Sequence, residues 1–154
     1  MEVYILCFFF VLGSIMGSFY HVVATRLSCE ESIIKPGSHC PRCNHFLKWY
    51  ENIPIISYLF LRGRCSSCNS KIPLSYLVVE IITGSLFAVC YHSFGLSLEL
   101  LVGLIFISSL IIVIICVMEY MIILDEVLIV STLLISVSYV VFLGFEDAAY
   151  HIYS

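Results

Sequence analysis

Charged residues are scarce in this chain, and their scarcity excludes an ordinary soluble protein. Only 12% of the 154 residues are charged, whereas 61% are hydrophobic and the mean hydropathy is +1.06. Soluble domains carry about 25% charged and about 45–50% apolar residues, so one small core cannot hide this much apolar surface. Disorder is excluded as well, because disordered chains lack the aliphatic and aromatic residues that dominate here.

Basic residues and prolines are missing from most of the sequence. All seven Lys and Arg residues lie from position 26 to 71, and all four prolines lie from 36 to 73. Most of the remainder is apolar, in runs at 3–25, 73–98, 100–118 and 127–145. A helix that crosses a bilayer needs about 20 apolar residues, with a range of about 17–25. We therefore predict an all-α polytopic membrane protein with four transmembrane helices.

The basic residues also predict the orientation in the membrane. Lys and Arg near helix ends favour the cytoplasmic side, so the segment that contains them is predicted to be cytoplasmic and the N-terminus to lie outside. We divide the chain into a first helix (1–26), a cytoplasmic loop domain (27–72) and a three-helix region (73–154). The basic residues are Arg26, Lys35, Arg42, Lys48, Arg62, Arg64 and Lys71.

One apolar stretch inside the loop, at 53–61, is too short to span a bilayer. A short apolar segment of this kind lies on the membrane surface or packs within a small subdomain. The sequence leaves both interpretations open.

Four cysteines form two pairs in the loop, with the spacing C-x2-C-x21-C-x2-C. A two-residue gap lets one turn aim both sulfurs at one ion, and two such turns complete a tetrahedral zinc shell. The spacing is close to that of a zinc ribbon. We therefore predict a structural Zn²⁺ site with a closed shell of four thiolates. The predicted ligands are Cys40, Cys43, Cys65 and Cys68.

Two alternatives to zinc are two disulfides or a redox pair. A cytoplasmic loop lies in a reducing compartment, which disfavours structural disulfides. A thioredoxin-type site has a βαβ context, which this sequence lacks. His39 and His45, which flank the first pair, are interpreted as ordinary loop histidines because four cysteines already complete the shell.

Glu80 and His21 are ionisable residues inside the apolar runs, where burial is costly and a functional role is the first hypothesis. Glu80 is about two turns into the second predicted helix, and His21 is near the loop-side end of the first. The two can pair at one membrane face, and they suggest a small transporter only weakly. The alternative for Glu80 is a structural hydrogen-bond partner. For His21 we expect a side chain that reaches toward the interface. Gly13 and Gly17 permit close helix packing.

Three carboxylates lie at the predicted cytoplasmic junction of the third and fourth helices. They are Glu119, Asp125 and Glu126. Two acids that share a proton can activate water, as in an aspartic protease. The alternative, a solvated polar turn between two helices, is favoured by the spacing alone.

Several segments together resemble the bacterial prepilin leader peptidases, including the competence-type members. The resemblance runs from the first helix to about residue 90 and is looser beyond 98. It rests on GSFYHVVATRL (17–27), CPRC (40–43), WYENIP (49–54), RGRCSSC (62–68) and LVVEIITG (77–84).

The resemblance implies a multi-pass aspartic endopeptidase of the bacterial inner membrane. Such enzymes cleave the leaders of type IV prepilins and pseudopilins at the cytoplasmic face, and many also methylate the new N-terminus. The two cysteine pairs correspond to their cytoplasmic zinc-binding loop. The implied partners are a prepilin or pseudopilin and membrane lipid, with no nucleic acid; an oligomer is left open.

The catalytic pattern of the family is not reproduced. The family has an Asp-x7-Asp stretch, and the alignment places Val117 at its first aspartate and Asp125 at its second. The Gly-x-Gly-Asp motif that carries the other catalytic aspartate is missing from these residues. Asp125 and Glu119 are therefore only weak catalytic candidates. We expect either a peptidase whose missing acid comes from a partner chain, or a truncated, non-catalytic relative that binds prepilin or secretion machinery through its zinc loop.

Overall fold

The computed structural model describes residues 2–29, 32, 37–40, 42–122 and 124–153, the last eleven of these as backbone only. Lys35, Pro36 and Pro41, which the sequence analysis places in the loop, lie outside the described residues.

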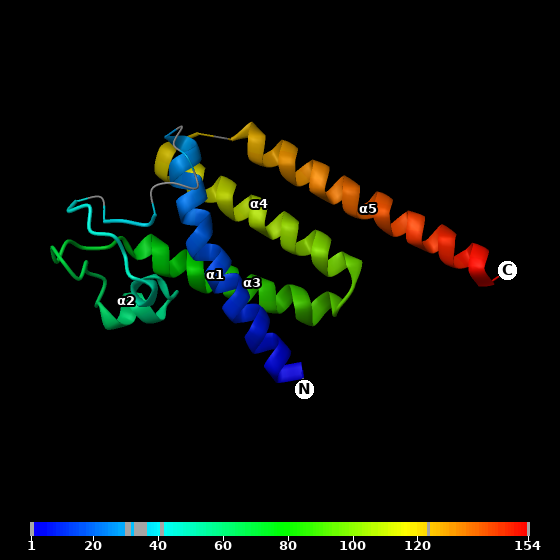
Figure 1. The fold of residues 1–154 in the computed structure, drawn as a ribbon, viewed down its shortest axis with the longest axis horizontal. Coiled ribbons are helices and arrows are strands. Elements are labelled where there is room, and N and C mark those ends of the chain that lie inside the picture. The colour runs from blue at the N-terminus through cyan, green and yellow to red at the C-terminus, as the bar shows by residue number, and fades with distance from the viewer. Residues whose placement is uncertain (1, 30–31, 33–36, 41, 123, 154) are drawn as a thin grey trace.

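Four long helices form the molecule: α1 (Glu2–Ser28), α3 (Leu74–Phe94), α4 (Leu98–Tyr120) and α5 (Asp125–Tyr153). All four are long and apolar enough to cross a membrane, so the predicted number of spans is confirmed. Figure 1 shows α1 crossing α3, α4 returning beside α3, and α5 lying on the far side of α4.

The α3–α4 turn follows from its residues. Gly95 has a φ of 62° and donates its N–H to the carbonyl of Tyr91, which ends α3. Ser97 then accepts the N–H of Leu100 at 3.3 Å and begins α4. A positive φ costs glycine little, and a serine hydroxyl satisfies one of the free N–H groups of a helix start. The two spans are therefore tightly connected and antiparallel.

The interface between α1 and α3 is the most extensive in the molecule. Small residues allow the two backbones to approach: a Cβ placed on Gly17 would lie 2.9 Å from the Thr83 hydroxyl. The close packing that the Gly13 and Gly17 pattern permits thus occurs between two helices of the same chain.

The helices α4 and α5 differ in how much of their surface packs against the rest of the bundle. On the loop side, α4 packs against α1 through a core cluster, and the Tyr20 hydroxyl donates a hydrogen bond to Ser108 of α4. In α5, only 6% of the apolar span is buried, against 28% in each of the other three. The described α5 contacts lie mainly on α4. The first three spans therefore form the compact part of the bundle. The core cluster consists of Tyr20, Ala24, Ile111, Ile115 and Cys116.

The loop between α1 and α3 contains two short helices, the 3₁₀ helix η1 (Trp49–Asn52) and α2 (Ile56–Phe60). Two isolated antiparallel bridges, His39 with Phe46 and Arg64 with Lys71, close the turns that contain the cysteine pairs. The four-cysteine loop between the first helix and the next span is thus confirmed.

Candidate functional site

The two cysteine pairs form equivalent turns. In the first, the backbone carbonyl of Cys40 accepts the N–H of Asn44 at 2.9 Å; in the second, the backbone carbonyl of Cys65 accepts the N–H of Asn69 at 3.0 Å. Asn44 and Asn69 have φ values of 52° and 56°. Asparagine tolerates this left-handed conformation better than other non-glycine residues. The Asn that follows each pair therefore lets the chain turn back and bring both sulfurs to one side.

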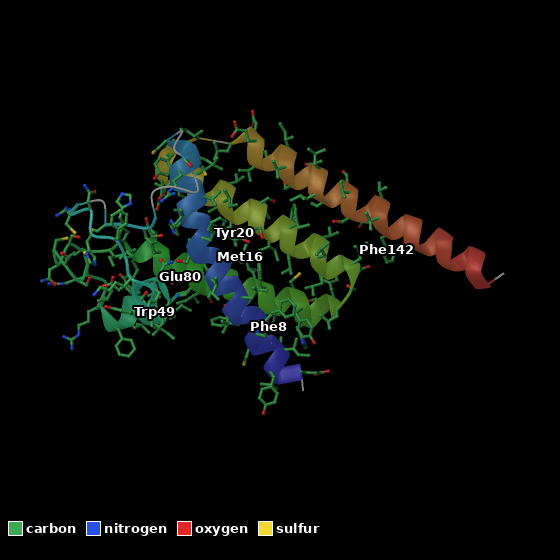
Figure 2. All side chains as sticks on the ribbon, in the orientation of Figure 1. Phe8, Met16, Tyr20, Trp49, Glu80 and Phe142 are labelled. Carbon is green, nitrogen blue, oxygen red and sulfur yellow. The ribbon has the colours of Figure 1, made fainter. Side chains whose placement is uncertain are left out.

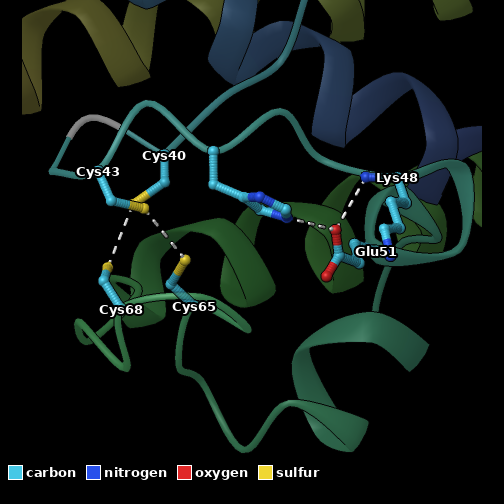
Figure 3. A network of polar contacts seen from close by, with 7 residues as sticks. Cys40, Cys43, Lys48, Glu51, Cys65 and Cys68 are labelled. Carbon is cyan, nitrogen blue, oxygen red and sulfur yellow. Dashed lines mark hydrogen bonds and ion pairs between the residues drawn. The ribbon is translucent and has the colours of Figure 1, made fainter.

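The four thiols converge on one point (Figure 3). Their sulfurs all lie within 4.8 Å of one another. Cys40 Sγ lies 3.8 Å from Cys68 Sγ, and Cys43 Sγ lies 3.9 Å from Cys65 Sγ. Zinc–sulfur bonds of about 2.3 Å in a tetrahedron separate the sulfurs by about 3.8 Å. The cluster therefore has the size and chemistry to hold a metal ion.

Hydrogen bonds and crowding set the ionisation of these thiols. The backbone N–H groups of Arg42 and Cys43 lower the pKa of the Cys40 thiol to about 6. The pKa of Cys43 is raised to about 11: the His45 N–H lowers it, but burial and the three neighbouring thiols outweigh that bond. Thiolates bind metals and thiols do not, so the cluster already favours ionisation at one ligand and resists it at another.

Glu51 connects the two turns. Its carboxylate accepts the N–H of Lys48 at 2.8 Å and lies 3.5 Å from Nε2 of His45 (Figure 3). A further hydrogen bond comes from the Ser66 side chain in the second turn, and this bond together with the Lys48 N–H lowers the pKa of Glu51. Only 3% of the Glu51 side chain is exposed. The role of Glu51 is not evident from the spacing of charges in the sequence, because a lone glutamate in a polar loop is ordinarily solvated.

Glu80 joins the membrane bundle to the loop (Figure 2). It is 7% exposed. Its Oε2 accepts the backbone N–H of Ile55 at 2.7 Å, and its carboxylate is also hydrogen-bonded to the Ser18 side chain of α1. The sequence left a functional and a structural role open for Glu80. These hydrogen bonds are those expected for a structural hydrogen-bond partner.

His21 lies against α3 and α4. It is 1% exposed, and its ring stacks on that of Tyr76 with the centroids 4.1 Å apart. Its Nδ1 lies 3.9 Å from a Glu119 carboxylate oxygen, which also accepts a hydrogen bond from Ser75 at 3.3 Å. The expectation that His21 reaches toward the interface is therefore wrong, since Tyr76 and Glu119 cover it. The carboxylate within ion-pair distance of His21 belongs to Glu119 and not to Glu80.

The remaining acid candidates lie on α5. Asp125 and Glu126 are exposed in the first turn of α5, where carboxylates stabilise a helix N-terminus. Val117, at the position aligned with a catalytic aspartate, lies on α4 and is 38% exposed. Within the described part of the chain, no hydrogen bond or ion pair joins Asp125 to Glu119.

The similarity to known proteins covers the region of the cysteine cluster. Residues 11–94, more than half of the chain, match the family model of the bacterial peptidase A24 N-terminal domain. The chain belongs to the prepilin leader peptidase family. The matched residues of this family member contain the cysteine cluster, Glu51, Glu80 and His21, and end before Glu119 and Asp125.

Relatives of the same name align over much of this chain. The prepilin leader peptidase/N-methyltransferase of Myxococcus xanthus is 48% identical over 104 residues, which are 68% of this chain and 31% of that protein. That of Bacillus subtilis is 43% identical over 120 residues, which are 78% of this chain and 48% of that protein. The aligned part of the chain thus spans 31% and 48% of the length of these two relatives, less than half of each. No solved structure matches it significantly.

Proposed function

We propose that this chain binds prepilin or pseudopilin leaders at the cytoplasmic face of the bacterial inner membrane, as the leader-binding part of a leader peptidase. The observation that supports the proposal is the four-cysteine loop, which the Ile55–Glu80 hydrogen bond joins to the α1–α3 pair; loop and helix pair both lie within the region that matches the peptidase family. The relatives carry the name prepilin leader peptidase. The concentration of basic residues in the loop supports its cytoplasmic location.

The metal in this proposal is zinc. The thiols of Cys40, Cys43, Cys65 and Cys68 would hold it, and a four-thiolate shell leaves no open position for a reacting water. The ion would therefore supply folding energy to the loop and no step of peptide cleavage. The positive charge of the ion would offset the repulsion between four thiolates, and would thereby favour the ionised form of Cys43, whose pKa burial and the neighbouring thiols raise.

Cleavage by two acids needs two carboxylates that share a proton. Glu119 is engaged by His21 and Ser75, whereas Asp125 lies exposed on α5. We infer that these 154 residues by themselves bind the leader without cutting it, and that cleavage requires acids from outside these residues.

The test uses the whole chain, co-expressed with a prepilin in cells that lack other prepilin peptidases. The prepilin leader carries a photo-crosslinking amino acid, and mass spectrometry reads both the pilin N-terminus and the crosslinked peptides. The expected result is an intact leader that crosslinks to this chain. Crosslinking should be lost with Cys40→Ser and kept with Cys29→Ser, which changes an exposed thiol outside the cluster.

Two results would refute the proposal. An intact leader that does not crosslink, with the chain present in the membrane and loaded with zinc, would exclude leader binding. A cleaved leader would show that a working pair of acids exists within this chain, and would make it a peptidase in its own right.

A further inference from the structure

The loop exposes an apolar surface that the bundle does not cover. Four side chains of η1 and α2 form it, with exposed fractions between 51% and 85%. We call these residues the loop patch; η1 and α2 contact each other, so they belong to one surface. The loop patch consists of Trp49, Ile56, Leu59 and Phe60.

The loop patch lies at the level of the membrane-spanning helices. The Ile55 N–H that precedes α2 is 2.7 Å from the carboxylate of Glu80. Glu80 follows the first residue of α3, Leu74, by six positions, a distance of about 9 Å along a helix that rises 1.5 Å per residue. Figure 1 shows α2 beside the start of α3. The start of α2 therefore lies beside the first two turns of α3 and not beyond the loop-side end of that helix.

The residue before α2, Ile55, has an unfavourable backbone conformation. Ile55 has a φ of 62° and a ψ of −53°, while Ile56 donates its N–H to the carbonyl of Pro54. A positive φ is unfavourable for a β-branched residue and persists only where the surroundings enforce it. Glu80, buried between α1 and α3, supplies that constraint by accepting the Ile55 N–H. The depth of α2 is thus fixed by a bond to the bundle.

Two basic residues flank the loop patch in the sequence. Lys48 precedes Trp49, Arg62 follows α2 by two residues, and both are exposed. The Lys48 ammonium lies 5.8 Å from the ring centre of Tyr50, itself 47% exposed. Glu51, the carboxylate within η1, is turned inward and buried. Trp and Tyr gather at membrane interfaces, and Lys and Arg beside them attract anionic headgroups.

We propose that the loop patch is an interfacial anchor that enters the leaflet on the loop side of the membrane, with Lys48 and Arg62 binding anionic phospholipid headgroups. Depth, aromatic content and flanking positive charge all match a lipid surface. The anchor fixes the orientation of the cysteine cluster above the membrane and does not depend on which substrate the protein binds. Docking of a protein segment on the same surface is the competing outcome.

The sequence provides its own probe, because Trp49 is the only tryptophan. The zinc-loaded full chain is placed in vesicles of phosphatidylcholine and phosphatidylglycerol in equal parts. Lipids with a nitroxide near the headgroup should quench Trp49 more strongly than lipids with a nitroxide near the tail end, and aqueous iodide should quench it weakly. Strong quenching by iodide with none by either nitroxide would overturn the proposal.

Matched variants test the lipid contacts. Arg62→Gln should reduce headgroup-level quenching in the mixed vesicles toward its value in phosphatidylcholine alone. Arg42→Gln, which removes an exposed charge from the first cysteine turn, should leave it unchanged. Equal effects of the two variants would exclude specific headgroup binding by Arg62. Zinc content, measured for each variant, confirms that the loop is folded.

Two further measurements separate the remaining outcomes. Glu80→Leu removes the acceptor for Ile55 and should increase iodide quenching, whereas Glu80→Gln keeps an acceptor oxygen and should have a smaller effect. A prepilin peptide is then added to the wild-type vesicles. If Trp49 is open to iodide before this addition and protected after it, the loop patch is a protein-docking surface and the lipid anchor is refuted.

Discussion

Gly13 of α1 and Gly84 of α3 lie against each other where the two helix backbones pack closely. A Cβ on Gly13 would lie 2.8 Å from the Cα of Gly84, and one on Gly84 would lie 2.7 Å from the carbonyl oxygen of Phe10. Real Cβ atoms do not approach backbone this closely. The short distance between α1 and α3 therefore requires glycine, which has no Cβ, at both positions. Small residues at such contacts let membrane helices pack by van der Waals contact, the main attraction available within lipid.

A valine at this contact should push the two helices apart. We expect Gly84→Val to lower the free energy of unfolding in detergent by about 1–3 kcal/mol, the usual cost of overpacking a core. The matched control is Ser85→Val, because Ser85 is the next residue of α3 and is exposed. Denaturant titration of both variants measures the difference. Equal stability of the two would show that this contact does not limit the packing.

Metal content should depend on the cluster and not on cysteine in general. The purified chain should contain one zinc ion, Cys40→Ser and Cys68→Ser should lose it, and Cys29→Ser should keep it. Elemental analysis by mass spectrometry gives the ratio directly. A chelator should make the loop sensitive to protease, because a structural site contributes its binding energy to folding. A loop that stays protected after the metal is removed would contradict a structural role.

The ionised form of Glu51 should stabilise the loop. Bonds from Ser66 and the Lys48 N–H hold its pKa below the ordinary value of 4.5. The folded pKa is depressed, so this stabilisation is present above about pH 4.5 and is lost as the pH falls through the folded pKa. Glu51→Gln should unfold more easily at neutral pH, and its difference from wild type should shrink on acidification. Protease resistance of the loop across this range measures the effect; a difference that does not change with pH would contradict it.

His21 and Glu119 should be energetically coupled. Their side chains lie 3.9 Å apart, and the Tyr76 ring covers the imidazole. A double-mutant cycle with His21→Ala and Glu119→Ala should give a coupling energy of about 0.5–3 kcal/mol, as found for residues in contact. Glu99, in the first turn of α4 at the opposite end of the helix, provides the control partner. Coupling of His21 to Glu99 that equals its coupling to Glu119 would show that the contact is not specific.

The parts of this structure that follow from local sequence were predictable. Length and apolar composition identify the four spans, since a bilayer allows few alternatives. The spacing of the four cysteines indicates their convergence, because each pair needs only one turn and the ion chemistry requires both pairs. The small residues of α1 likewise indicated a close helix contact.

The interactions across elements were not predictable from the sequence. Whether His21 faces Glu119 or Glu80 depends on how α1, α3 and α4 rotate against one another, and each of these helices is apolar around its whole circumference. Periodicity therefore shows no preferred face. The Glu80 bond to Ile55 joins residues 25 positions apart through a strained backbone, which no local propensity favours. Tertiary packing determines both the partner of His21 and the hydrogen bond between Glu80 and Ile55.

The arrangement of α1 and α3 also constrains the order in which the chain is assembled. Gly13, Ser14 and Gly17 enter the membrane well before Gly84 has been synthesised, so α1 has no partner until the whole loop has followed it. Joining the two cysteine turns through one ion would shorten the flexible connection between these spans and lower the entropy lost when they meet. Metal uptake by the nascent loop would then precede helix pairing, and zinc starvation would leave newly inserted chains with unpaired first helices.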